Sequence, residues 1–261
     1  MPRPFTHYYF SKKLTEDMSY ALSAIIKLYP DAYLLGSMGA ELFKEKEYKV
    51  RFESSDPVQL FGVTAHHIYT NGSKCQLSYM LGALSHYALD RAVNPFVSYF
   101  AANGVAGYYG GKIETVSHED IEIGIDRHVV RDYLSMNKAT EIIEGFKTRK
   151  AVLEEITDLY MDVLNDLADI YMNSHKTYAL LEGGKPEIPV SEGLGRLDFM
   201  NRENREWADL QKQKKTLSID EILSEEAENA YALLEEYMAM ARSNKTPDES
   251  KFMLNGLGEK I

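Results

Sequence analysis

The stretch MLGALSHYALD at residues 80–90 constrains the fold of this chain more than any other part of the sequence. It is apolar, contains no proline and has no turn signal after Gly82, a pattern that predicts a buried helix. His86 and Asp90 stand four residues apart within it, so on a helix they share one face, with Cβ atoms roughly 6 Å apart. A buried carboxylate needs a cation, a metal ion or several donors, and a histidine with a carboxylate at this spacing suits a zinc site. The alternative is a core histidine that is hydrogen-bonded to its neighbour.

Composition limits the classes of protein to which the chain can belong. Its 261 residues suffice for one large domain or two small ones, and its net charge of −11 argues against nucleic-acid binding and against docking on an anionic membrane by charge. A single cysteine excludes an internal disulfide framework and fits a reducing compartment. The first ten residues lack the apolar core of a secretory signal, and no run approaches the ~18 apolar residues of a transmembrane helix. We therefore predict a cytoplasmic protein with no transmembrane segment.

Helical periodicity and turn residues predict an all-α protein without an alternating strand signal of any length. The main predicted helices cover residues 14–28, 32–43, 74–99 and 218–240, with a probable pair between 137 and 181. His7 precedes the first of them, Pro95 kinks or ends the third, and residues 44–72 are expected to be irregular. We expect a single domain over residues 1–261, with a metal-site half at about 1–130, a helical scaffold at about 131–245 and a loose tail at 246–261.

The histidines concentrate in the first half of the chain. Six of the seven are His7, His66, His67, His86, His118 and His128. His118 and Glu122 repeat the four-residue spacing of His86 and Asp90 on a second predicted helix. Imidazole and carboxylate groups without thiolates suit zinc, manganese or iron, so a multinuclear metal site is plausible. Neither HExxH, a His-Asp dipeptide, Glu-x-x-His nor a Walker-type phosphate loop occurs, which argues against several other metal-site and nucleotide-binding classes.

Five motifs follow one another along residues 5–126. They are His7, LLGSMGAE at 34–41, TAHHIYT at 64–70, LSHYALD at 84–90 and His118-x-x-x-Glu122. In this order and spacing they resemble the bacterial zinc-dependent phospholipase C family, and the later LDFMN…W at 197–207 resembles the intracellular branch of that family. The resemblance implies an all-helical single-domain fold, shared with single-strand-specific zinc nucleases, and a cluster of three zinc ions.

The resemblance also implies a role for each matching residue. Metal ligands would be His7 at one zinc ion, His67, His86 and a carboxylate (Glu41 or Asp31) at a second, Asp90 as a bridge, and His118 with Glu122 at the third. The implied reaction is hydrolysis of a phosphodiester, in which zinc neutralises phosphate oxygens and activates a water molecule. Glu41 or Asp31 could orient that water, so Glu41 and Asp90 are the candidate catalytic residues. The implied substrate is a small phosphodiester or a phospholipid headgroup.

Departures from the family pattern bear on this implied activity. The chain has Gly39-Ala40-Glu41 where the family has Gly-Pro-Asp, and a longer side chain moves the ligand oxygen by about one bond length. Asn94-Pro95 stands where the family has His-Pro, so one imidazole is missing, and Asp126 is a possible substitute one turn beyond Glu122. We therefore expect two or three zinc ions. The alternatives are a nuclease or phosphatase on the same fold, or a catalytically impaired homologue that binds a metal or another ligand.

Overall fold

The computed structural model describes residues 3–186 and 196–261, and helices predominate in both ranges, which confirms the predicted all-α class for the described chain. The α-helices are α1 (Pro4–Leu14), α2 (Tyr20–Leu28), α3 (Pro30–Met38), α4 (Lys46–Ser54), α5 (Pro57–Thr70), α6 (Lys74–Asn103), α7 (His118–Val129), α8 (Met136–Gly145), α9 (Lys150–Leu159), α10 (Asn165–Leu167), α11 (Ser174–Gly183) and α12 (Ile219–Ser243). Tighter or wider helical turns are η1 (Gly39–Leu42), η2 (Tyr108–Gly110), η3 (Val130–Leu134), η4 (Tyr160–Leu164) and η5 (Glu249–Lys251). Strands β1 (Val105–Ala106) and β2 (Ile113–Glu114) form one antiparallel pair, and β3 (Trp207–Ala208) and β4 (Lys214–Lys215) form another.

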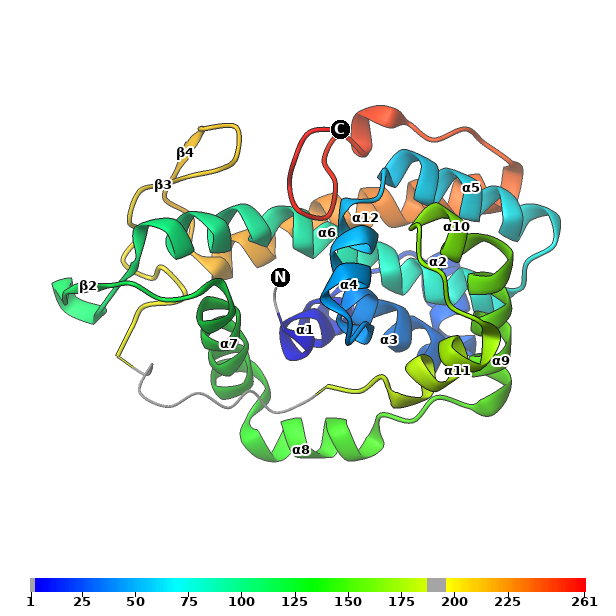
Figure 1. Cartoon of the computed structure of the whole chain (residues 1–261), viewed down its shortest axis with the longest axis horizontal. Helices are drawn as coiled ribbons and strands as arrows, with labels where there is room; N and C mark the ends of the chain where they lie inside the picture. Colours follow the sequence, from blue (N-terminus) through cyan, green and yellow to red (C-terminus); the bar gives the residue numbers. More distant parts are fainter. Residues whose placement is uncertain (1–2, 187–195) are drawn as a thin grey trace.

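Helix α6 crosses the middle of the molecule, and α1, α3, α5 and α12 lie around it (Figure 1). A capping box fixes its start, because the Ser73 hydroxyl accepts from the Gln76 backbone while the Gln76 side chain accepts from the Ser73 N–H. Residues 75–90 are all buried, as expected for a helix that is apolar on every side. Pro95 was predicted to kink or end this helix. It does not end it, because the helix continues to Asn103 and stops where Gly104 adopts a φ of 82°.

Two glycines bring α3 into backbone contact with α6. A Cβ atom on Gly36 would lie 2.0 Å from the Tyr79 carbonyl oxygen, and one on Gly82 would lie 2.0 Å from the Tyr33 carbonyl oxygen. No side chain fits at these distances. Each helix therefore has a glycine at the position where the backbone of the other helix packs against it. This close approach carries the end of α3 and the η1 turn to the level of His86.

The first seventy residues contain more helix than the sequence led us to expect. His7 lies inside α1 and not before the first helix, because Pro4 occupies the first helical turn, where its missing N–H costs nothing. The predicted helix over 14–28 begins only at Tyr20, after a cap by Ser19. Residues 46–54 and 57–70 form α4 and α5 instead of an irregular segment, and Asp56, which resembled part of a turn, caps α5 ahead of Pro57.

The remaining elements complete one large cluster of buried apolar side chains, to which α12, α9 and the segment around Phe252 all contribute. Contrary to the prediction of a loose tail, residues 252–258 are packed against α6, because Phe252 is fully buried between Phe61 and Tyr87. Most of the Gly/Pro loop expected at 183–195 lies outside the described residues. Among the described helices, none is both long and apolar enough to cross a membrane.

Candidate metal centre

His7, His86 and Asp90 meet in the interior, between α1 and α6. The Nε2 atom of His86 lies 2.8 Å from one Asp90 carboxylate oxygen, and the Nε2 atom of His7 lies 3.1 Å from the other. The two imidazole rings stack with centroids 3.9 Å apart. One potential ligand atom from each residue lies within 4.8 Å of the other two, and all three side chains are at least 97 % buried. Of the predicted ligands, the structure therefore brings these three together.

The position of His7 depends on its neighbour Thr6. The Thr6 N–H and hydroxyl both donate to one carboxylate oxygen of Asp126, at 2.6 and 2.7 Å. Asp126 is fully buried on α7, so it holds the first turn of α1 against α7 and fixes the direction in which His7 points. Its place one turn after Glu122 made Asp126 a possible ligand, and in the structure it anchors the residue beside His7.

The position of His86 depends on the η1 turn. Its Nδ1–H donates to the Ser37 carbonyl at 3.1 Å, which directs Nε2 toward Asp90. Gly39 has a φ of 48°, and a Cβ atom there would lie 2.3 Å from the ring of His86. The turn can therefore lie against the imidazole only because residue 39 is glycine.

The pKa values of the three groups follow from burial and from their closeness. Burial and, to a smaller degree, the neighbouring imidazole of His86 lower the pKa of His7 to about 4. Burial also acts to lower the pKa of His86, but the adjacent Asp90 carboxylate outweighs it and leaves the pKa above the ordinary value. The pKa of Asp90 is lowered, because the two histidines outweigh the burial that would raise it. Asp90 is therefore a carboxylate at neutral pH, with His7 a neutral imidazole.

Unsatisfied buried atoms concentrate around this centre. Eight buried side-chain oxygen or nitrogen atoms in the described residues have no hydrogen-bond partner, although native interiors pair the great majority of such atoms. Six of the eight are both ring nitrogens of His7, one oxygen of Asp90, one of Asp126, one of Glu53 and the amide oxygen of Asn94. The Nε2 atom of His7 and this Asp90 oxygen lie 3.1 Å apart, but not in the geometry of a hydrogen bond. A divalent cation accepts lone pairs of this kind, so the donor set and its unmet valences fit a bound metal ion.

Glu53, which the sequence did not single out, belongs to the surroundings of this centre. Its carboxyl group lines the same small cavity, about 20 Å³, that His86 and Asp90 line. Burial raises the pKa of Glu53 to about 7, and the charge of Asp90 adds to the effect. Residues 44–72 carry many charged side chains, and nothing in their pattern distinguishes this glutamate, since only the fold places it beside α6.

Glu41 lies at the edge of the centre and not within the group of three. Its carboxylate is 2.5 Å from the Lys49 ammonium group on α4. It lines a cleft of about 870 Å³ together with Arg3, Lys44 and other residues of η1 and α11. Asp31, the alternative carboxylate, lies in the first turn of α3, pairs with Arg149 at 2.7 Å and takes no part in the centre.

His118 and Glu122 form a separate pair on α7, with 3.0 Å between the Nδ1 atom and a carboxylate oxygen. Burial lowers the pKa of His118 to about 4, so its imidazole is neutral and can bind a metal. Asn94, on the other hand, donates its amide to the Gly256 carbonyl at 2.7 Å. The pair on α7 does not join the group of His7, His86 and Asp90.

His67, predicted to share an ion with His86, is placed elsewhere. Its Nε2 atom lies 3.9 Å from a carboxylate oxygen of Asp162 on η4, near the end of α5. Its neighbour His66 is hydrogen-bonded to the Asn244 side chain at 2.7 Å. On α5, His66 thus contacts the residue that follows α12 and His67 lies near η4, so neither histidine joins His86.

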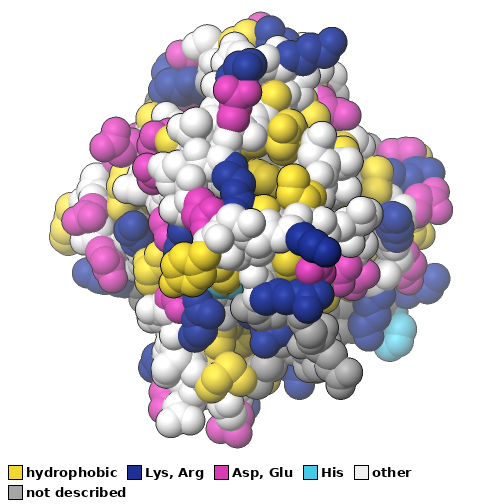
Figure 2. Space-filling model, turned by 90° about the vertical axis from the view of Figure 1, so that its left-hand side faces the viewer, with side chains coloured by type: hydrophobic (Ala, Val, Ile, Leu, Met, Phe, Trp, Pro, Cys, Tyr) yellow, Lys and Arg dark blue, Asp and Glu magenta, His cyan; other side chains and the backbone are white. Residues whose placement is uncertain are grey.

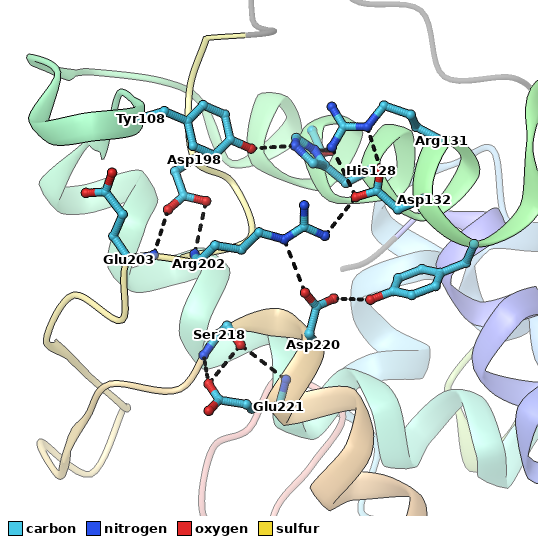
Figure 3. A network of polar contacts seen from close by, with 12 residues as sticks. Tyr108, His128, Arg131, Asp132, Asp198, Arg202, Glu203, Ser218, Asp220 and Glu221 are labelled. Atoms are coloured by element: carbon cyan, nitrogen blue, oxygen red, sulfur yellow. Dashed lines mark hydrogen bonds and ion pairs between the residues drawn. The ribbon is translucent and has the colours of Figure 1, made fainter.

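A second polar cluster joins the end of α7 to the loop before β3 and to α12 (Figure 3). Arg202 lies between Asp132 and Asp220, at 2.7 and 3.2 Å. The imidazole of His128 is satisfied on both sides, since Nδ1 contacts the Gly124 carbonyl at 2.7 Å and Nε2 contacts the Tyr108 hydroxyl at 2.8 Å. Its arginines are paired with carboxylates and its histidine has a partner on each side, so this cluster connects elements of the fold.

The face of the molecule at its strand-bearing end shows basic, acidic and apolar side chains interspersed, with no broad surface of one charge (Figure 2). Ion pairs on the elements at this end include Arg196 with Glu114 and Lys214 with Glu206. A polyanion needs a continuous basic surface, and this face does not offer one.

Comparisons with models of known protein families, with curated proteins and with solved structures find no match for this chain.

Proposed function

We propose that the protein is a zinc-dependent hydrolase of small phosphodiesters, with one zinc ion held by His7, His86 and Asp90. The observation that carries the proposal is the meeting of these three buried side chains, each of which brings one potential ligand atom within 4.8 Å of the other two. Two imidazoles and one carboxylate form a donor set that zinc favours, and three protein ligands leave a coordination position open, as catalytic zinc sites require. When bound, zinc supplies Lewis-acid polarisation of a phosphoryl oxygen.

The chain's own residues would orient the substrate. Lys44, Lys176 and Lys185 line the large cleft, and no ion pair of their side chains with another described residue is found, so they can receive an anionic group. Glu41 links the cleft to the metal centre. It lines the cleft, and its negative charge acts to raise the pKa values of His7 and His86. A volume of about 870 Å³ is within the range of small-molecule sites and admits a headgroup-sized phosphodiester.

A single zinc ion agrees better with the geometry than the two or three implied by the family pattern. Asn94 is engaged by Gly256, His67 lies beside Asp162, and the pair on α7 stands apart. Each of these residues would have to move before a second or third ion could share ligands with Asp90.

A second candidate function is metal binding without catalysis. The observation that favours it is the enclosure of the centre, since the cavity that His86 and Asp90 line measures only about 20 Å³, enough for one water molecule. A catalytically impaired homologue of the phospholipase C type would hold a metal ion in such an enclosed site without hydrolysing a substrate.

The test combines zinc content with hydrolysis of a chromogenic phosphodiester. The unmodified protein, dialysed against low micromolar zinc, should bind one equivalent and hydrolyse the ester, and the His86→Ala and Asp90→Ala variants should do neither. The matched control is His67→Ala, which should behave as the unmodified protein. One equivalent of zinc without hydrolysis would support the second candidate, and equal zinc in all four proteins would refute the site.

A further inference from the structure

Residues 249–261, which we name the strap, lie against α6 on the side of the small cavity (Figure 1, red). The strap begins with η5 and is anchored by Phe252, whose ring centroid is 5.7 Å from that of Phe61 and 6.3 Å from that of Tyr87. Since Phe252 is fully buried, this residue fixes one end of the strap in the core.

Three side chains from successive turns of α6 hold the backbone of the strap. The Tyr87 hydroxyl donates to the Leu254 carbonyl at 2.6 Å, Arg91 donates to the Lys251 carbonyl at 2.9 Å, and Asn94 donates to the Gly256 carbonyl at 2.7 Å. These residues alternate along the helix with His86 and Asp90. The strap is therefore fastened to the same stretch of helix that carries two of the proposed ligands.

Gly256 joins the strap to the opposite wall of the cavity. Its N–H donates to the Glu53 carbonyl on α4 at 2.9 Å, while its own carbonyl accepts from Asn94 on α6. The side chain of Asn255 accepts from the backbone of Leu257 and of Glu259, which folds the strap into a tight turn at this point. Gly256 itself lines the cavity with Glu53, His86 and Asp90, so the turn forms part of its wall.

A second glycine seats the strap on the only proline of α6. Gly258 has a φ of 80°, and a Cβ atom there would lie 2.7 Å from the Pro95 ring and 3.1 Å from the Arg91 carbonyl. Proline removes the hydrogen bond that this carbonyl would otherwise receive within the helix. The strap thus covers the place where α6 lacks a backbone hydrogen bond.

We propose that the strap closes the metal centre, and that its opening sets the rate at which the ion enters and leaves. The proposal rests on the zinc site proposed above. His86 and Asp90 are almost completely buried, so an ion cannot exchange without movement of a neighbouring element. Beyond the Phe252 anchor, the strap is held by individual contacts, which also include Gln211 to the Gly258 carbonyl at 3.2 Å and Lys251 with Glu236 at 3.2 Å. Its only helical turn is the short η5, and segments of this kind open without unfolding of the whole domain. Asn94, at the position where the family pattern has an imidazole ligand, then holds the strap closed through its hydrogen bond to the Gly256 carbonyl.

The test removes hydrogen bonds between α6 and the strap and leaves the proposed zinc ligands unchanged. The variant Tyr87→Phe with Asn94→Leu keeps the ring and approximates the volume of the amide, but it removes two donors to the strap. Zinc release into excess chelator should become faster by about tenfold or more, and amide hydrogen exchange at Gly256 should accelerate to a similar degree. Zinc stoichiometry should remain that of the unmodified protein. If the double variant fails to fold, Tyr87→Phe alone should show a smaller acceleration of both rates.

The matched control is Tyr237→Phe with Asn165→Leu. Tyr237 is also a buried tyrosine that donates its hydroxyl, and Asn165 is also a buried asparagine that donates to a carbonyl, at 2.9 Å to Met172. Neither touches the strap, so this variant should release zinc as the unmodified protein does. Faster exchange at Gly256 with unchanged zinc release would overturn the strap as a gate, as would unchanged exchange at Gly256. Absence of zinc from the unmodified protein would refute the proposed function before any variant is compared.

Discussion

At the scale of single residues, the centre combines groups that burial pushes toward neutrality with one carboxylate that stays ionised. Asp126 and Glu53 both have pKa values raised to about 7 by burial, whereas the histidines keep Asp90 charged. Buried carboxyl groups of raised pKa reduce stability as pH rises, because the folded chain must either keep the proton or desolvate a charge. This loss of stability with rising pH applies to the metal-free protein, and the positive charge of a bound cation would offset it.

Asp126→Asn tests this effect. The folded pKa of about 7 lies above the unfolded value of 3.8, so the group stabilises the fold at low pH and loses that contribution as pH rises toward 7. The amide keeps an oxygen for the Thr6 donors. Between pH 5 and pH 8, metal-free unmodified protein should lose roughly 1–3 kcal/mol more stability than the variant, measured by urea unfolding with chelator. Equal pH dependence in both proteins would show that Asp126 is already ionised when buried.

At the scale of helices, the contact between α3 and α6 positions the site, because it carries Ser37 and Gly39 to the imidazole of His86. A methyl group at position 82 would collide with the Tyr33 carbonyl, and neither backbone can move without separating the two helices. Packing at this crossing therefore controls both the stability of the fold and the orientation of a ligand.

Gly82→Ala should accordingly lower the free energy of unfolding by roughly 2–4 kcal/mol, as expected for overpacking in a rigid core. The control is Gly145→Ala at the end of α8, where a Cβ atom would meet nothing within 4 Å. Chemical denaturation of both variants gives the comparison. A Gly82→Ala protein as stable as the control would mean that the helices are not in backbone contact.

The sequence predicted the parts of this arrangement that local pattern determines. The apolar run of α6, the pairing of His86 with Asp90 within it and the start of α12 at Ser218 are all visible in the local sequence. The start of α1 at Pro4, the existence of α4 and the inward position of Glu53 were not predicted, because tertiary packing stabilises such short helices more than their local sequence does. His67 matched a motif, yet the direction of its helix depends on contacts with α12 and η4 that sequence spacing does not encode.

At the scale of the whole molecule, the centre is a meeting point of distant segments. His7 comes from α1, His86 and Asp90 from the middle of the chain, Glu53 from α4, and Gly256 from the strap. An ion that binds these ligands binds only the folded chain, and such binding stabilises the fold by linkage.

Zinc at a hundred times its dissociation constant should therefore add about 2.7 kcal/mol to the stability of the protein and raise the melting temperature by several degrees. The shift should vanish with chelator and in the His86→Ala variant, and it should persist in His67→Ala. Thermal melts followed by circular dichroism provide the measurement. A shift of the same size in His86→Ala would place the stabilising ion elsewhere.

The most direct test of the account is X-ray absorption at the zinc edge of protein loaded with one equivalent of the metal. We predict a first shell of nitrogen and oxygen at about 2.0–2.1 Å with the outer-shell scattering of two imidazoles, and no sulfur at about 2.3 Å. The His7→Ala variant should show one imidazole. A shell without imidazole, or one that His7→Ala leaves unchanged, would contradict the assignment of the metal to His7, His86 and Asp90.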